Sequence, residues 1–233
     1  MTDPDRGSLG YPRVHLRETD STNVVARALA GRGAPQGTLV TADRQTAGRG
    51  RQGRAWVAPA GASLLCSWVI RDPGLLISLA AGVAVAELAG ERARIKWPND
   101  VLIDGRKLAG ILVEGRPQEG WAVLGIGINV ALRLEQLPAE LRDRAATLGL
   151  TAADREPVLS RLRDGLERWL AAPDDAVLDA VRSRDALRDR PLRWDAGSGT
   201  GAGIDGTGRL LVDLADGSSV ALDAGEVHLG LQR

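Results

Sequence analysis

Residues 46–56 read Thr-Ala-Gly-Arg-Gly-Arg-Gln-Gly-Arg-Ala-Trp, and we call this stretch the basic loop. Three glycines and three arginines alternate in it. The backbone can therefore bend closely around a ligand while the guanidinium groups deliver positive charge to it. The pattern favours a site for a phosphate or another anion. On this stretch alone a solvated surface loop is an equal alternative, so the residues before and after it have to decide.

The composition is that of a folded globular protein. Of 233 residues, 44% are hydrophobic and 26% are charged, which excludes a disordered chain. The 30 basic and 30 acidic residues balance, so there is no overall positive field to hold a nucleic acid and any anion site must be local. No uncharged apolar run reaches the length of about 20 residues that spans a membrane, and the polar N-terminus has no signal core. We expect a cytoplasmic protein that does not bind membranes.

Cysteine and histidine are too scarce for a disulfide or a clustered metal site. Cys66 is the one cysteine, and it stands in an apolar run, which predicts a buried thiol rather than a nucleophile. The two histidines, His15 and His228, are far apart in the sequence. We therefore expect no residue set dedicated to a metal ion.

The N-terminal half alternates short strands with helices. Asp20-Ser21-Thr22-Asn23 offers several side chains that can cap a helix, although small hydroxyl and amide groups at such a turn can also bind a polar ligand. The strand that follows leads through Gln45 directly into the basic loop. Hydrophobic patterning predicts strands at 13–17, 37–42 and 62–70, a helix at 24–30, and a long, nearly uncharged core helix at 75–88.

A strand must end in a turn at Ile95–Asp100, because Pro98 lacks a backbone donor and biases Trp97 toward an extended conformation. Asp104-Gly105 is a strong hairpin signal. Two glycines in a later strand clear space on one face of the sheet. The expected elements are strands at 101–103, 107–114 and 121–130, followed by helices at 153–170 and 174–184.

The composition changes near residue 188, where glycine begins to punctuate short alternating segments. We predict a domain of residues 1–187 and a small all-β domain of residues 188–233. Three glycine-containing segments are expected as turns, at 196–203, 205–208 and 216–217.

Four motifs occur together, and in this order and spacing they resemble those of the biotin protein ligases. They are Gly-Arg-Gly-Arg-Gln-Gly-Arg-Ala-Trp (48–56), Lys-Trp-Pro-Asn-Asp (96–100), Lys-Leu-Ala-Gly-Ile-Leu-Val-Glu (107–114) and Gly-Ile-Gly-Ile-Asn (125–129). The resemblance extends from about residue 14 to the C-terminus. It implies an α+β fold: a mixed sheet with helices on one side, related to the catalytic core of class II aminoacyl-tRNA synthetases, and a C-terminal SH3-like β-barrel.

The resemblance also implies an ATP-dependent ligase that works in two steps. Biotin is first activated as biotinyl-5′-AMP, and a lysine of a biotin carboxyl carrier domain then displaces AMP. ATP and Mg²⁺ would be co-substrates, with no permanently bound cofactor. By matching positions, the expected biotin-binding residues are Ser21, Thr22, Asn23, Gln45, Arg49, Gly50, Arg51, Lys107, Gly110, Gly125 and Gly127, and the nucleotide-binding residues are Arg51, Arg54, Trp56, Asn99, Lys107 and Asn129.

Catalysis is expected to rest on four of the charged residues. Arg49 and Arg51 would neutralise the two anions that meet in the first step, and Lys107 would contact both the carboxylate and the α-phosphate. Asp100 would orient the acceptor lysine, which must lose a proton before it attacks. Gly125 and Gly127 would let the flat biotin bicycle lie against the sheet, and Trp97, like Trp56, is a candidate cover for the adenine.

Other functions fit less well. A lipoate or octanoate ligase shares the adenylate chemistry, but its dithiolane or alkyl chain has no use for the polar groups at Ser21, Thr22 and Gln45. An RNA-binding arginine-glycine module would need interleaved aromatic residues and a basic chain. Only about twenty residues precede Ser21, so an operator-binding helix-turn-helix and hence a DNA partner are not expected. A homodimer is possible.

Overall fold

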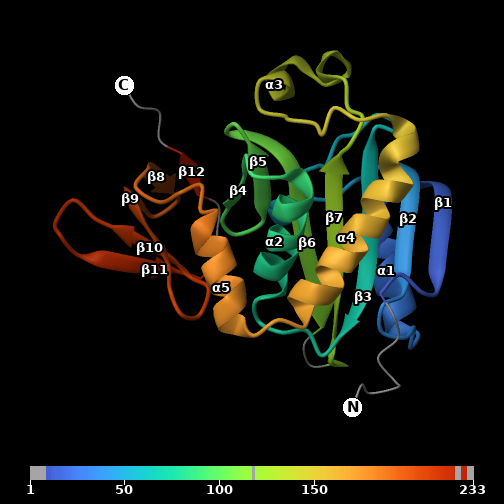
Figure 1. Cartoon of the computed structure of the whole chain (residues 1–233), viewed down its shortest axis with the longest axis horizontal. Helices are drawn as coiled ribbons and strands as arrows, with labels where there is room; N and C mark the ends of the chain where they lie inside the picture. The colour runs from blue at the N-terminus through green and yellow to red at the C-terminus, as the bar shows by residue number, and fades with distance from the viewer. Residues whose placement is uncertain (1–8, 117–118, 224–226, 230–233) are drawn as a thin grey trace.

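The structure is a computed structural model that describes residues 9–116, 119–223 and 227–229 (Figure 1). Its larger part is a seven-stranded sheet with the strand order β1-β2-β3-β7-β6-β5-β4. Strands β1 and β2 run parallel, and every other neighbouring pair is antiparallel, so the sheet is mixed. The strands are β1 (Arg13–Thr19), β2 (Leu39–Gln45), β3 (Ser63–Arg71), β4 (Ala93–Lys96), β5 (Asp100–Ile103), β6 (Arg106–Arg116) and β7 (Trp121–Asn129).

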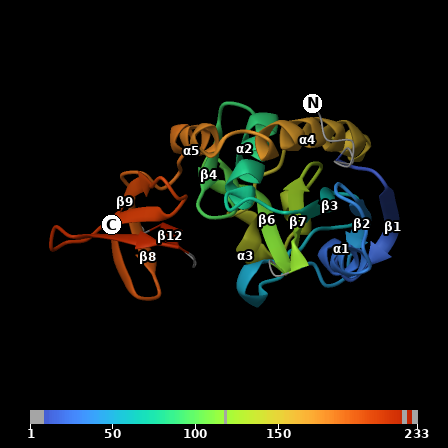
Figure 2. The ribbon, with the colours of Figure 1, turned by 90° about the horizontal axis from the view of Figure 1, so that it is seen from below.

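Helices cover both faces of this sheet (Figure 2). Successive strand residues point to opposite faces. In β3, Trp68 therefore belongs to the main core beneath the helices α2 (Ile77–Ala89) and α4 (Arg155–Leu170), whereas Val69 packs with α1 (Thr22–Gly31). The expectation of helices on one side only was wrong. Along β3 and β7 the residues that point to either face of the sheet are buried. These strands therefore need a covering layer on each side.

Helix α2 is the buried helix that its lack of charge predicts. Nine of its thirteen residues are buried, and it packs between the sheet and α4. Gly165 of α4 faces Ala84 of α2, where an added Cβ would lie 3.4 Å from the alanine Cβ. A further helix, α5 (Asp174–Ser183), leads to the C-terminal module, and the short helix α3 (Ala139–Arg142) lies in the segment after β7. No helix of the described residues is long and apolar enough to cross a membrane.

The C-terminal module is a five-stranded antiparallel sheet with the order β11-β10-β9-β8-β12. Its strands are β8 (Pro191–Trp194), β9 (Gly197–Ile204), β10 (Leu210–Asp213), β11 (Ser219–Leu222) and β12 (His228–Leu229). The module shares one continuous hydrophobic core with α2 and α5, to which Leu192, Leu210 and Val212 belong. The predicted α+β class with a small β module is confirmed, and the domain boundary near residue 188 stays a prediction.

Most of the segment 196–203 lies in strand β9 and is not the expected turn; only residue 196 belongs to a turn, the one that joins β8 to β9. Its glycines permit close packing rather than chain reversal: an added Cβ at Gly201 would lie 2.1 Å from the Leu187 carbonyl oxygen, and one at Gly199 would lie 2.4 Å from that of Asp213. The other two expected turns connect β9 to β10 and β10 to β11. Glycine density alone therefore misled the prediction at this strand.

Candidate functional site

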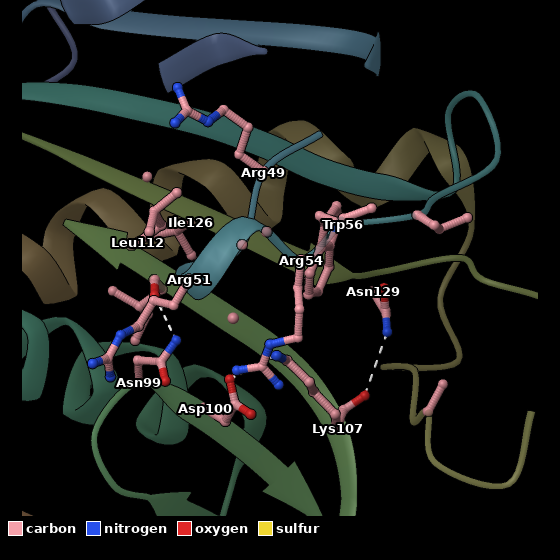
Figure 3. A pocket seen from close by; sticks show the side chains of 18 of the residues that line it. Arg49, Arg51, Arg54, Trp56, Asn99, Asp100, Lys107, Leu112, Ile126 and Asn129 are labelled. Atoms are coloured by element: carbon pink, nitrogen blue, oxygen red, sulfur yellow. Dashed lines mark hydrogen bonds and ion pairs between the residues drawn. The ribbon is translucent and has the colours of Figure 1, made fainter. Parts of the chain in front are cut away.

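One cavity of about 580 Å³ gathers sixteen of the residues that the sequence predicted for the site, all except Trp97 (Figure 3). It is bounded by the basic loop, the face of the sheet that carries α1, the segment after β7, and residues 228–229 of the C-terminal module. The predicted residues on its wall are Ser21, Thr22, Asn23, Gln45, Arg49, Gly50, Arg51, Arg54, Trp56, Asn99, Asp100, Lys107, Gly110, Gly125, Gly127 and Asn129. The structure places them together, while their individual roles stay predictions.

The polar end of the cavity lies at the start of α1. Ser21 occupies the N-cap position but makes no side-chain capping bond. The Gln45 side chain from β2 does so instead, because its Oε1 accepts a hydrogen bond of 2.8 Å from the Thr22 backbone N–H, one of the unpaired donors of a helix start. The hydroxyl groups of Ser21 and Thr22 are thus not consumed by capping.

Asn23 is held on three sides. Its Nδ2 donates to Glu114 Oε2 at 2.9 Å, and its Oδ1 lies 2.6 Å from the hydroxyl of Ser67. An added Cβ on Gly125 would lie 2.0 Å from Asn23 Oδ1. The space above Gly125 is therefore filled by this amide, and not left open for a flat ligand as expected.

The indole of Trp56 fills the corresponding space above Gly127. An added Cβ there would lie 2.7 Å from the ring, and one on Gly110 would lie 3.1 Å from it. The Lys107 Nζ lies 5.6 Å from the centroid of the same ring, within range of a cation–π contact. The indole N–H is buried without a hydrogen-bond partner among the described residues, so a ligand acceptor could pair with it.

Lys107 and Asp100 form an ion pair at the other end of the cavity. Nζ lies 2.7 Å from Asp100 Oδ1, although no aligned hydrogen bond reaches that buried oxygen. The backbone of Lys107 is fixed on both sides, since its N–H donates to the Arg144 carbonyl at 2.7 Å and its carbonyl accepts from Ala146 N–H at 2.8 Å. The lysine is therefore held from a rigid strand, with an exposed fraction of 38% for its side chain.

The two asparagines predicted for the nucleotide support the cavity wall. Asn99 Nδ2 donates to the Ile111 carbonyl at 2.9 Å, and Asn129 Nδ2 donates to the Ala146 carbonyl at 2.9 Å. Asn129 Oδ1 also accepts from the Ser63 hydroxyl at 3.1 Å. Both side chains therefore stabilise the cavity wall through hydrogen bonds. Contact of either one with a nucleotide stays a prediction.

The cavity is strongly cationic. In Figure 3 the Arg54 side chain extends toward Asp100 and Lys107, whereas Arg49 points the other way. An ion pair of 3.2 Å joins Arg49 Nη2 to Glu114. The described residues that line the cavity include one carboxylate, Asp100, and six cationic side chains: Arg49, Arg51, Arg54, Lys96, Lys107 and Arg144. Such a lining fits an anionic ligand.

The structure tests the predictions made for Trp97 and Cys66. Trp97 is 3% exposed and its Nε1 donates to the Gly208 carbonyl at 2.9 Å, so it joins the core to the C-terminal module and does not line the cavity. Its candidacy as an adenine cover was wrong. Cys66 is buried as predicted. Burial raises the pKa of its thiol, and its Sγ donates to the Ile126 carbonyl, as suits a structural residue.

Sequence reasoning missed several residues that build the site. Ser67 and Glu114 contact Asn23, while Lys96, Arg144 and His228 line the cavity. Ser67 was detectable as a polar residue inside an apolar strand, and Glu114 as the last residue of the 107–114 motif. No sequence signal points to residues 228–229, because only the fold brings the C-terminal module to the cavity.

No group of three or more His, Cys, Asp or Glu side chains that could hold a metal ion occurs within the described ranges. The donors around the cavity are instead suited to bind anions.

Comparison with known proteins agrees with these motifs. The sequence profile of the Biotin/lipoate A/B protein ligase family matches residues 15–130. A curated relative from Mycobacterium tuberculosis, named biotin--[acetyl-CoA-carboxylase] ligase, is 36% identical over 92% of this chain and 88% of its own length. The chain belongs to the biotin/lipoate A/B protein ligase family. A bifunctional ligase/repressor BirA from Bacillus subtilis is 42% identical over 63% of this chain, and the match spans only 49% of that relative.

A solved structure of this family extends the agreement to the fold. The biotin protein ligase from Aquifex aeolicus, determined in complex with biotin and ATP, is similar with a TM-score of 0.81 and 27% sequence identity. The alignment covers 94% of this chain and all (100%) of that chain. It therefore includes both the seven-stranded sheet and the C-terminal module. The predicted relation to the ligase fold is confirmed.

Proposed function

We propose that this family member is an ATP-dependent biotin protein ligase, which activates biotin as biotinyl-5′-AMP and transfers it to a lysine of a biotin carboxyl carrier domain. The observation that carries the proposal is a single cavity with a polar, hydroxyl- and amide-lined end and a cationic end. A ureido ring with a carboxylate chain, followed by a nucleotide phosphate, needs these two ends in this order. Relatives named as biotin ligases support the same activity.

In the first step the biotin carboxylate attacks the α-phosphorus of ATP, an O–P bond forms and pyrophosphate leaves. Two anions must approach, which is unfavourable unless cations lie beside them. Lys107 can bridge both from its fixed position on β6, and the arginines of the basic loop can neutralise the phosphates. Mg²⁺ would enter with the nucleotide as a co-substrate, because the described residues offer no metal cluster.

In the second step the acceptor amine attacks the carbonyl carbon of the mixed anhydride. A C–N bond forms, the C–O bond to AMP breaks, and the amine loses its proton. The side chain of an ordinary lysine has a pKa of about 10.4, so most lysine amines are protonated at neutral pH. Asp100 is the cavity carboxylate that can hold and orient the ammonium group and then accept a proton from it.

The polar end favours biotin over lipoate. Ser21, Thr22, Asn23 and Gln45 surround a small space with donors and acceptors, which a ureido group can satisfy. A dithiolane offers these groups no hydrogen-bond partner of its own, and sites built for hydrogen bonds reject such analogues strongly. We also infer two structural units, a catalytic unit up to about residue 187 and a C-terminal β unit. A homodimer is one possible assembly, and light scattering would measure the oligomeric state.

The test is an ATP–pyrophosphate exchange assay with biotin, with lipoate and with octanoate, beside a salt titration of binding to single-stranded RNA. Exchange that depends on biotin alone supports the proposal. Exchange that depends on lipoate or octanoate would instead assign the protein to the lipoate or octanoate ligases. Salt-sensitive RNA binding without any exchange would instead support a non-enzymatic basic module.

A further inference from the structure

Four side-chain oxygens stand in a row at the polar end of the cavity. Asn23 Oδ1 lies 2.6 Å from Ser67 Oγ, which lies 2.8 Å from Thr22 Oγ1, which lies 2.9 Å from Gln45 Oε1. The side chains come from α1, β2 and β3, and the residues Thr22, Asn23 and Ser67 are each less than 5% exposed. All three oxygen–oxygen contacts are within hydrogen-bond distance.

The amides at both ends of the row are locked with their oxygens inward. Asn23 Nδ2 faces the Glu114 carboxylate at 2.9 Å and the Leu112 carbonyl at 3.4 Å, and neither group can donate a hydrogen. Gln45 Oε1 accepts from the backbone N–H of Thr22 at 2.8 Å, which fixes the orientation of that amide too. The two end oxygens therefore carry no hydrogen.

The row is one hydrogen short. The hydroxyls of Ser67 and Thr22 bring one hydrogen each, while the row has three oxygen–oxygen contacts. One contact must therefore bring lone pairs together in a buried place, and such a place favours a hydrogen-bond donor from outside. Thr22 lines the cavity and is the member of the pair of hydroxyls that a ligand can reach.

We propose that Glu114 is a positioning residue that sets the polarity of this row, so that the cavity selects a ligand N–H at Thr22. The inference rests on the proposed biotin ligase function, because a ureido group supplies N–H donors. The Glu114 side chain is 17% exposed and also pairs with Arg27 at 3.3 Å and Arg49 at 3.2 Å, so two cations flank the carboxylate to which Asn23 donates.

Glu114→Gln adds hydrogen-bond donors at position 114 without changing the shape of the side chain. The glutamine amide can donate to Asn23 Oδ1, so the Asn23 amide can turn and present Nδ2 to Ser67. Ser67 can then donate to Thr22, and Thr22 to Gln45, which satisfies all three contacts within the protein. The row no longer needs a donor from the ligand.

The experiment compares biotin with two cyclic carbamates, in which one or the other ureido N–H is replaced by a ring oxygen. Wild-type protein should prefer biotin over one of the two by on the order of 100-fold in kcat/KM for adenylate formation. In Glu114→Gln the KM for biotin should rise about tenfold, the KM for ATP should stay unchanged, and the preference should shrink at least tenfold.

Two further variants keep the test decisive. Arg27→Gln removes a cation from the same carboxylate but leaves its bond to Asn23, so its preference should equal that of wild type. Thr22→Val removes the proposed acceptor and should abolish the preference even if Glu114→Gln does not fold. An unchanged preference in folded Glu114→Gln, or in Thr22→Val, overturns the inference. Wild-type protein that activates neither biotin nor its analogues overturns the proposed function instead.

Discussion

The ion pair between Asp100 and Lys107 joins the two residues that we assign to different steps. Nζ of Lys107 and Oδ1 of Asp100 are 2.7 Å apart, so each side chain holds the other in place. A bound anion would compete for the lysine, and the carboxylate would then become available to an acceptor amine. The same contact can therefore coordinate the order of activation and transfer.

Asp100→Asn should separate the two steps. Formation of adenylate from biotin and ATP should change little, because Lys107, the residue that we assign to that step, is unaltered. Transfer from preformed adenylate to a carrier lysine should slow about 100-fold, since the group that orients and deprotonates the amine is lost. Single-turnover transfer kinetics measure this. Asp104→Asn in the adjacent hairpin is the control, and transfer at the wild-type rate in Asp100→Asn would remove the proposed role.

At this scale the sequence identified residues but not their partners. Sixteen of the predicted residues line the cavity, because the motifs carry them as sets, and Trp97 alone does not. The pairing of Asn23 with Ser67 and Glu114 could not be predicted, since it joins residues from three separate elements. The same is true of Trp56, whose position over Gly127 depends on the path of the loop.

The basic loop is the element on which we expect retention of the intermediate to depend. Residues 51–53 form a short 3-10 turn, and the Gly50 N–H donates to the Arg54 carbonyl at 2.7 Å. The loop lines the cavity together with the sheet, and glycines allow it to close over a bound adenylate and exclude water.

Arg51→Gly should release the adenylate. In the absence of an acceptor, free biotinyl-5′-AMP should appear at least about tenfold faster than from wild type, because one of the cations that we expect to hold the phosphate is gone. Gln52→Gly is a matched control: Gln52 has a positive φ of 55°, so glycine suits the position and adds flexibility without removing charge. Release from Arg51→Gly that is no faster than from Gln52→Gly would contradict the account.

The connection between α5 and β8 contains a destabilising carboxylate. Asp185 Oδ1 accepts from Leu187 N–H at 2.8 Å, but its buried Oδ2 has no partner among the described residues. Burial raises the pKa of Asp185 above its ordinary value. The cost of burying the charge is therefore present above the raised pKa and disappears below the unfolded one.

Asp185→Asn should therefore raise the free energy of unfolding at pH 7 by about 1 kcal/mol. The gain over wild type should shrink as the pH falls through the raised pKa toward the ordinary carboxyl range. Denaturant unfolding at several pH values measures it. Asp189→Asn, whose side chain is 87% exposed, serves as the control and should change little. A gain in Asp185→Asn that does not depend on pH would contradict the explanation.

Elements were predicted well where the hydrophobic period was clear. The long apolar run at 75–88 and the alternating strands of the sheet have one structural solution each. Strand β9 was missed because its glycines are selected by the close approach of Leu187 and Asp213, contacts that no local pattern encodes.

At the scale of the whole molecule, the C-terminal module completes the cavity. The Trp97 indole donates a hydrogen bond to the Gly208 carbonyl, the module shares the main core, and His228 and Leu229 line the cavity. The sequence predicted the module and its class, but its position against the site follows from packing between distant segments. The fold thus makes a second structural unit part of the cavity wall.

The most direct test of the central claim is the mass of a carrier domain after incubation with this protein, ATP, Mg²⁺ and biotin. We predict the addition of one biotinyl group at one lysine, and no addition when that lysine of the carrier is replaced by arginine or when ATP is left out. A carrier domain of unchanged mass, under conditions in which an established biotin ligase modifies it, would contradict the account.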